Sequence, residues 1–161
     1  MPMKTRVRTR FTIRKAGIKS RLRVPLFLSR VHCGFPSPAT DYLENVLDLN
    51  ELCIVHPDDT YFVRVEGNSM VNPHARLNSR IDDGDILVVD CLIEPVDGQV
   101  IVAFVNDGYV VRRMKRVGEM LLLKADNPSY EPIYMHPGDP GEDSFVFGTV
   151  VWVFFKPSIL P

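Results

Sequence analysis

From Tyr61 to Phe155 the chain alternates between short runs of apolar residues, many of them β-branched or aromatic, and short clusters of turn residues. Such runs are typical of strands, because these side chains pack well on a pleated surface. Asn106-Asp107-Gly108 separates two of the runs and predicts a hairpin turn. Many short strands joined by tight turns favour a mostly-β, barrel-like core. The predicted strands are Tyr61–Val65, Ile86–Val89, Val100–Val105, Tyr109–Met114, Met120–Leu123 and Phe145–Phe155.

The N-terminal residues have a different charge balance from this β region. Of the 19 Lys and Arg residues, 10 fall within Met1–Arg30, which holds no Asp or Glu. That leaves 9 basic residues for the rest of the chain, against all 20 acidic ones. A basic arm therefore precedes an acidic body, and the arm can attract nucleic acid, an anionic membrane or the body itself. A solvated tail without such a role is the alternative interpretation.

Two segments join the arm to the β region. Residues 25–40 contain Gly34, Pro36 and Pro38, and prolines at that spacing oppose both helix and sheet. We therefore expect an extended, accessible segment. From Thr40 to Leu52 apolar residues recur at near-helical spacing, which predicts a short helix that Asp41 could cap.

The cysteines and the apolar runs limit the class of protein. Cys33, Cys53 and Cys91 include no Cys-x-x-Cys pair, so neither a disulfide framework nor a zinc site is expected. Clusters of acidic residues lie in turn-rich stretches and are interpreted as turns rather than metal sites. The longest apolar runs are far too short to span a bilayer. We expect a soluble, cytoplasmic protein with no metal, no cofactor and no membrane partner.

The candidate nucleophile is Ser69, in the segment Glu66-Gly67-Asn68-Ser69-Met70 at the end of the first predicted strand. A serine after a glycine turn can present its hydroxyl, and nearby backbone N–H groups could bind an oxyanion. Taken alone, this pattern is far more typical of an ordinary turn.

Several longer segments occur in the order of one known family. CGFPSPATDYLE, which begins at Cys33, resembles the cleavage-site region of UmuD, and HPDDTYFVRVEGNSM, which ends at Met70, resembles its catalytic serine segment. DDGDILVVD, DGQVIVAFVNDG, LLKADNPSYEPI and FGTVVWVF follow in the family's order. The chain is thereby identified as a UmuD-like member of the LexA/UmuD (S24-type) serine peptidase family, over about residues 25 to 156.

This resemblance implies a fold, an activity and partners. In the family a serine/lysine dyad within a β-rich fold cuts the protein's own N-terminal segment, here at Cys33–Gly34, when the RecA filament on single-stranded DNA stimulates it. UmuD-like members then serve as the shortened subunit of a translesion polymerase. The implied partners are a second copy of the chain, the RecA–DNA filament and a DNA polymerase of UmuC type. We expect residues 1–33 to form the arm and residues 34–161 the peptidase-fold domain.

The family's general-base lysine falls on Arg112 in this sequence, within Val111-Arg112-Arg113-Met114. Strand alternation places Arg112 on the face of Val110 and Met114 and turns Lys115 the other way. Arginine does not readily release its proton, so it is a poor general base. Three interpretations stay open: an inactive or impaired self-protease, a different base such as His74, or a register that differs by a few residues.

The length before the cleavage site bears on the subfamily. Only 32 residues precede Cys33, which is too few for the helix-turn-helix domain of a LexA-like repressor. We therefore expect a UmuD-type accessory protein for the SOS response and translesion synthesis, with a basic arm that could contact DNA phosphates. The alternative is a catalytically impaired regulatory or polymerase-binding subunit, cut in trans or not at all.

Overall fold

The computed structural model describes residues 13–15, 23–27, 43–74, 80–137 and 143–157, which form ten strands and one short helix. The elements are β1 (Ile13–Lys15), β2 (Arg23–Phe27), β3 (Leu43–Asp48), α1 (Leu49–Cys53), β4 (Thr60–Arg64), β5 (Ile86–Asp90), β6 (Val100–Val105), β7 (Gly108–Val117), β8 (Met120–Lys124), β9 (Ile133–Met135) and β10 (Phe145–Phe154). The predicted mostly-β class is confirmed. All six predicted strands are present, although β1, β2, β3 and β9 were not predicted.

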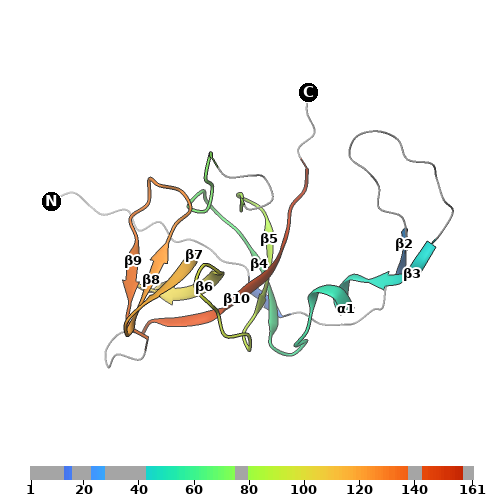
Figure 1. Ribbon diagram of the computed structural model, residues 1–161, viewed down its shortest axis with the longest axis horizontal. Coiled ribbons are helices and arrows are strands. Elements are labelled where there is room, and N and C mark those ends of the chain that lie inside the picture. The colour runs from blue at the N-terminus through green and yellow to red at the C-terminus, as the bar shows by residue number, and fades with distance from the viewer. Residues whose placement is uncertain (1–12, 16–22, 28–42, 75–79, 138–142, 158–161) are drawn as a thin grey trace.

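Eight strands form one antiparallel sheet in the order β1-β4-β5-β10-β6-β7-β8-β9. The long strand β10 runs through its middle, between β5 and β6 (Figure 1). Its register shifts between Val150 and Trp152 against β5, and between Val146 and Gly148 against β6. Such irregularities bend a strand, so β10 can serve both halves of the sheet. Gly148 is needed here, because an added Cβ would lie 2.8 Å from Val89 Cγ1.

The two halves of the sheet have separate apolar cores. Strand β6 contributes to both, since successive side chains point to opposite faces: Val102 enters the first core, while Ile101 and Ala103 enter the second. The first core consists of Val63, Val65, Met70, Ile81, Leu87, Val89, Val102 and Val111. The second consists of Ile101, Ala103, Val105, Met114, Leu121, Leu123 and Met135. Residues from the Ser69 turn and from β7 therefore share the first core.

The turn between β6 and β7 is the hairpin that the sequence predicts. Asn106 and Asp107 have φ angles of 50° and 62°, and Val105 pairs with Gly108 across them. Two consecutive left-handed residues suit the right-handed twist of the flanking strands, and Asn and Asp tolerate that conformation. The turn fixes the register of β7, and with it the face on which Arg112 lies.

The helix predicted over Thr40–Leu52 is wrong in its extent. The structure has strand β3 over Leu43–Asp48, and the helix α1 spans only Leu49–Cys53. Pairing with β2 satisfies the backbone of β3, so a non-local partner overrides the local helical spacing. Asp48 caps the helix by accepting from the Asn50 N–H at 2.9 Å, whereas Asp41 lies outside the described residues. No helix in the described ranges is long and apolar enough to span a membrane.

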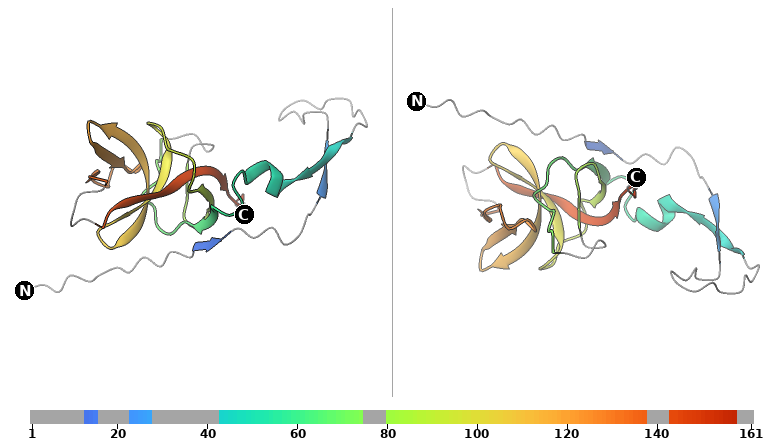
Figure 2. Two further views of the ribbon diagram at one scale, coloured as in Figure 1. Left: turned by 90° about the horizontal axis from the view of Figure 1, so that it is seen from below. Right: turned by 90° about the horizontal axis from the view of Figure 1, so that it is seen from above.

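Two strands, β1 and β2, lie within the basic N-terminal region. β1 adds to β4 at the margin of the large sheet, with Ile13 opposite Val63, and β2 pairs with β3. The β2–β3 pair stands apart from the large sheet, with α1 between them (Figures 1 and 2). Pro25 lies within β2, so the expectation that prolines exclude sheet from this segment is wrong at this position; the register shifts beside it, between Pro25 and Leu26. Cys33 and Gly34 lie outside the described residues.

Candidate active site

The turn that carries Ser69 begins where β4 ends. The Val65 N–H donates to the Asp85 carbonyl oxygen at 2.8 Å, which ties this end of β4 to the start of β5. Gly67 has φ +94°, a conformation that favours glycine, and its N–H donates to Asp83 Oδ1 at 2.7 Å. Met70 is buried in the first core, and the half-buried Ser69 precedes it. The turn is thereby anchored on both sides of the candidate nucleophile.

A second segment, after β8, holds the same turn. The Asn127 backbone N–H donates to the Ser69 carbonyl oxygen at 3.0 Å, and Asn127 Nδ2 donates to the Asn68 carbonyl oxygen at 3.0 Å. The Tyr130 hydroxyl donates to Asn68 Oδ1 at 2.7 Å. In the sequence, the surrounding LLKADNPSYEPI stands out only for its place in the motif order. Asn-Pro-Ser followed by Tyr was a turn signal, but no sequence pattern could show which loop it would contact.

Strand β7 brings Arg112 to Ser69. Arg112 Nη1 donates to Ser69 Oγ at 2.7 Å and to the Val111 carbonyl oxygen at 2.7 Å. Val110 and Met114 both pack in the second core, as the predicted alternation requires, and Lys115 is exposed. The structure therefore brings together the two residues, Ser69 and Arg112, that the sequence predicts for the catalytic pair.

Arg112 is buried, and no carboxylate of the described residues is paired with its guanidinium. Its side chain is 8% exposed, and Nε is buried with no hydrogen-bond partner among the described residues. Burial lowers the pKa of Arg112 below its ordinary value, and Tyr130, whose ring centre lies 5.7 Å from Arg112 Cζ, acts in the opposite direction. An arginine nevertheless stays charged in proteins. Arg112 can therefore donate hydrogen bonds to Ser69 Oγ or to an oxyanion, but it does not accept the serine proton.

Ser69 and Arg112 line a pocket of about 470 Å³. The wall is mainly apolar, and its single acidic residue, Glu66, is exposed and has no hydrogen bond to Ser69 among the described residues. The lining residues are Val65, Glu66, Gly67, Asn68, Ser69, Met70, Tyr109, Val110, Val111, Arg112 and Tyr130. A hollow of this kind suits an extended peptide with apolar side chains.

The histidines that the structure describes, His56, His74 and His136, are not among the lining residues of this pocket. His74 is exposed, its backbone N–H donates to Asn72 Oδ1, and it is not among the lining residues. His56 Nδ1 lies 2.7 Å from Asp90 Oδ2, at the far end of β5, and His136 also lies outside the lining. His32 is outside the described residues. Within the described ranges no group of three His, Cys, Asp or Glu side chains could hold a metal ion.

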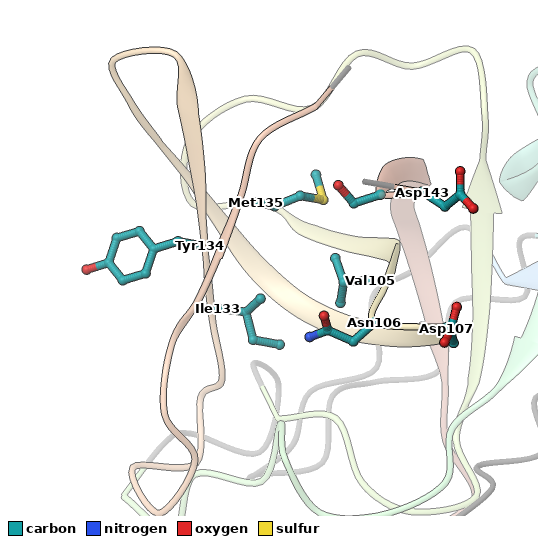
Figure 3. A pocket seen from close by; sticks show the side chains of 8 residues that line it. Val105, Asn106, Asp107, Ile133, Tyr134, Met135 and Asp143 are labelled. Atoms are coloured by element: carbon teal, nitrogen blue, oxygen red, sulfur yellow. The ribbon is translucent and has the colours of Figure 1, made fainter. Parts of the chain in front are cut away.

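A second hollow, of about 270 Å³, lies beside the β6–β7 turn and β9 (Figure 3). Val105, Ile133 and Met135 form its apolar part, while the ring of Tyr134 points away (Figure 3). It contains Ser144, whose Oγ is buried without a partner in the described residues. No basic side chain lines it, so it lacks the serine-and-cation pairing of the Ser69 pocket.

Comparison with known proteins identifies the family. The sequence model described as Peptidase S24-like matches residues 25–151. The chain belongs to this family. The chain is 36% identical to Protein ImpA of Escherichia coli over 133 residues, which covers 82% of the chain and 83% of ImpA. It is 42% identical to Protein MucA of Salmonella typhimurium over 91 residues, 56% of the chain and 58% of MucA.

The LexA repressor of Acidovorax sp. (strain JS42) is also similar, with 34% identity over 123 residues, 76% of the chain and 51% of that repressor. The predicted membership of the LexA/UmuD (S24-type) family is therefore confirmed. Within this S24 member, the roles of Ser69, Arg112, Cys33 and Gly34 stay predictions, and the two residues of the proposed scissile bond lie outside the described part of the chain.

Proposed function

We propose that this chain is an SOS-response and translesion-synthesis accessory protein of UmuD type, activated by RecA-stimulated self-cleavage at Cys33–Gly34. The observation that carries the proposal is the 2.7 Å contact between Ser69 Oγ and Arg112 Nη1. It joins the serine of one family segment to the residue at the family's general-base position in another, 43 residues away. A serine hydroxyl beside a buried cation in a pocket is an arrangement that serine peptidase chemistry can use.

In the proposed reaction, Ser69 Oγ attacks the carbonyl carbon of Cys33. Arg112, and backbone N–H groups of the Ser69 turn, stabilise the negative charge that develops on the carbonyl oxygen. The Ser69 hydroxyl loses its proton to solvent as it attacks, because Arg112 cannot accept it. The bond to Gly34 then breaks, and its nitrogen takes a proton from solvent and leaves as the amine. Water hydrolyses the resulting Ser69 ester, which restores the Ser69 hydroxyl and leaves a carboxylate at Cys33. Cys33 and Gly34 are small residues, so this bond can approach a serine within a narrow pocket.

The UmuD type, rather than the LexA type, is supported by how much of each relative the chain matches. The alignment covers 83% of ImpA but only 51% of the LexA repressor. A UmuD-type protein would act as a cytoplasmic homodimer and would bind the RecA–DNA filament and a translesion polymerase of UmuC type. The basic arm, residues 1–33, would contribute non-specific contacts to DNA phosphates before its removal from the domain of residues 34–161.

The identity of Arg112 favours a second candidate function. Because the guanidinium keeps its proton, the pocket offers Ser69 a hydrogen-bond donor and no general base of the family's kind. In that case the chain is a regulatory or polymerase-binding subunit of the same type, which is cut in trans or stays intact. The two candidates share the fold, the pocket and the partners, and they differ in whether the chain cuts itself.

Self-cleavage is tested by following the intact mass of the purified full-length protein with and without activated RecA filament. The primary proposal expects a fragment that begins at Gly34 and accumulates with time. Ser69→Ala is the test of the nucleophile, and Ser144→Ala, in the second hollow, is the matched serine control. The fragment is expected to vanish in Ser69→Ala and to persist in Ser144→Ala.

Each other outcome has a definite meaning. An intact chain under every condition would refute self-cleavage and leave the second candidate. A Gly34 fragment that forms equally in Ser69→Ala would show that Ser69 is not the nucleophile. A fragment that appears only when an active relative is added would indicate cleavage in trans.

A further inference from the structure

Arg112 is buried, yet the groups that contact its guanidinium do little to offset the positive charge. Proteins rarely bury a guanidinium without a carboxylate, because loss of hydration costs free energy that only a partner can offset. Nη1 is used twice, on Ser69 Oγ and the Val111 carbonyl oxygen, while Nε is buried with no hydrogen-bond partner among the described residues. Both of the acceptors present are neutral. A buried cation of this kind beside a pocket is a candidate for binding an anion.

The pocket itself indicates which class of anion fits. A planar guanidinium matches a carboxylate, to which it can donate two parallel hydrogen bonds. Arg112 Nη1 donates to Ser69 Oγ, so a carboxylate bound to this guanidinium lies next to the serine hydroxyl. The surrounding wall includes Val65, Met70 and Val110, which suit the apolar part of a peptide rather than a phosphate or a sugar. The exposed Glu66 is the one acidic residue of the lining.

We propose that the Ser69–Arg112 pocket binds the α-carboxylate at the C-terminus of a peptide, and that its occupant is the cleaved arm of this chain, which ends at Cys33. The identity of the occupant rests on the proposed function. Addition of water across the Cys33–Gly34 bond gives an ammonium group on Gly34 and a carboxylate on Cys33. That carboxylate forms where the attacked carbonyl lay, beside Ser69 and Arg112, and supplies the counter-charge that the guanidinium lacks.

Two further features favour the arm over an unrelated peptide. The arm carries 10 basic residues and no acidic one through Arg30, whereas the rest of the chain holds 9 basic and 20 acidic residues. The arm also contains β1 and β2, which pair with β4 and β3 of the remainder. These pairings do not depend on the bond at Cys33, so they keep the arm attached to the remainder after a cut. After cleavage the arm therefore stays bound to the rest of the chain, and a partner has to displace it.

The test uses two synthetic peptides of residues 28–33, Leu-Ser-Arg-Val-His-Cys, one with a free C-terminal carboxylate and one with a C-terminal amide. Each is titrated into full-length protein, shown by mass to be uncut, in reducing buffer and by isothermal titration calorimetry. The peptides begin after β2 ends at Phe27, so they do not compete with it for β3. We expect the carboxylate form to bind at least about tenfold more tightly, as is usual for a charge-assisted contact.

Matched variants attribute this preference to the pocket. Arg112→Gln is expected to abolish it and Arg113→Gln, one residue away on the opposite face, to retain it. Urea unfolding of Arg112→Gln beside wild type guards against a folding defect in that variant. Equal affinity of the two peptides, or a preference that survives in Arg112→Gln, would overturn the carboxylate site.

A scrambled peptide of the same composition, again ending in Cys, separates the arm from any other C-terminus. Weaker binding of the scrambled form supports the arm as occupant, and equal binding overturns that assignment. Because added peptide needs no cut in the chain, failure here is distinct from failure of self-cleavage. A chain that never cuts itself but discriminates between acid and amide refutes only the proposed function.

Discussion

Arg112 and Arg113 are consecutive residues on β7, but the two faces of the strand treat them in opposite ways. Arg113 forms a two-pronged pair with Asp126, with Nε to Oδ1 at 2.9 Å and Nη2 to Oδ2 at 2.6 Å. Its Nη1 donates to the Gly98 carbonyl oxygen. The hydrogen bonds to Asp126 raise the pKa of Arg113, whereas burial lowers the pKa of Arg112.

Because of this difference, the charge of Arg113 stabilises the fold, whereas the charge of Arg112 is available to bind a ligand. Arg113 is 36% exposed and its donors have acceptors, so its charge ties β7 to the start of the 126–130 segment. Arg112 is more deeply buried and has a neutral serine as its side-chain partner. Identical side chains one position apart therefore differ in what they can still bind. Strand alternation predicts from the sequence that they lie on different faces, but only the structure shows that Arg113 pairs with Asp126 and Arg112 with Ser69.

The largest expected effect comes from Arg112→Lys, which makes the buried cation titratable. Burial lowers the pKa of a lysine below its ordinary value of about 10.4, so a neutral amine becomes available to take the Ser69 proton. Self-cleavage is expected to accelerate by about 10²- to 10⁴-fold, the usual contribution of a general base. The measurement is the rate of Gly34-fragment formation by intact mass between pH 7 and 10.

The rate of Arg112→Lys should rise with pH and level off above the lowered pKa, because the amine is then fully neutral. Arg113→Lys is the control and should leave the rate unchanged. If Arg112→Lys were no faster than wild type at any pH, the assignment of Arg112 to the general-base position would be wrong.

Stability should respond to the two arginines in opposite ways. Arg113→Met leaves Asp126 without its partner and should lower the free energy of unfolding by about 1 kcal/mol, after allowance for solvent screening of a partly exposed pair. Arg112→Met removes a buried charge without a counter-ion and should leave stability unchanged or raise it by about 1 kcal/mol. Urea unfolding of both variants beside wild type measures the contrast.

The raised pKa of Arg113 determines how its contribution to the free energy of unfolding depends on pH. The pKa of Arg113 is raised, so its stabilisation is fully present below the pKa of an unfolded arginine and is lost only above it, far beyond the neutral range. The deficit of Arg113→Met should therefore stay constant between pH 7 and 10. Equal losses in Arg112→Met and Arg113→Met would show that the two charges are compensated alike.

The smallest expected effect concerns the contact of Tyr130 with the serine turn. Tyr130→Phe removes the hydroxyl that donates to Asn68 Oδ1 and keeps the ring near Arg112. At this exposed position the loss should be about 0.5 kcal/mol in urea unfolding. Tyr134→Phe, at a tyrosine that is 61% exposed, is the control and should change nothing measurable. A larger loss in Tyr134→Phe than in Tyr130→Phe would contradict the assigned role.

Much of the β region could be predicted because its signals are local. The hairpin at Asn106-Asp107 follows from residues that tolerate positive φ, and the face of Arg112 follows from strand alternation. The error over Thr40–Leu52 has the opposite origin, since β3 forms through pairing with residues 16 to 25 positions earlier. The hydrogen bond from the Asn127 N–H to the Ser69 carbonyl oxygen also joins segments that are far apart in the chain. A single sequence carries no record of such long-range choices.

The place of β1 has a consequence for the solubility of a shortened chain. β1 is the outermost strand of the large sheet, so its backbone covers the hydrogen-bonding groups of β4. Removal of the first 33 residues exposes Tyr61–Val63 as a bare sheet margin, and bare margins recruit strands from other chains. Preparations of residues 34–161 should therefore be handled as aggregation-prone, and a peptide of residues 10–18 added in excess is a rational protectant.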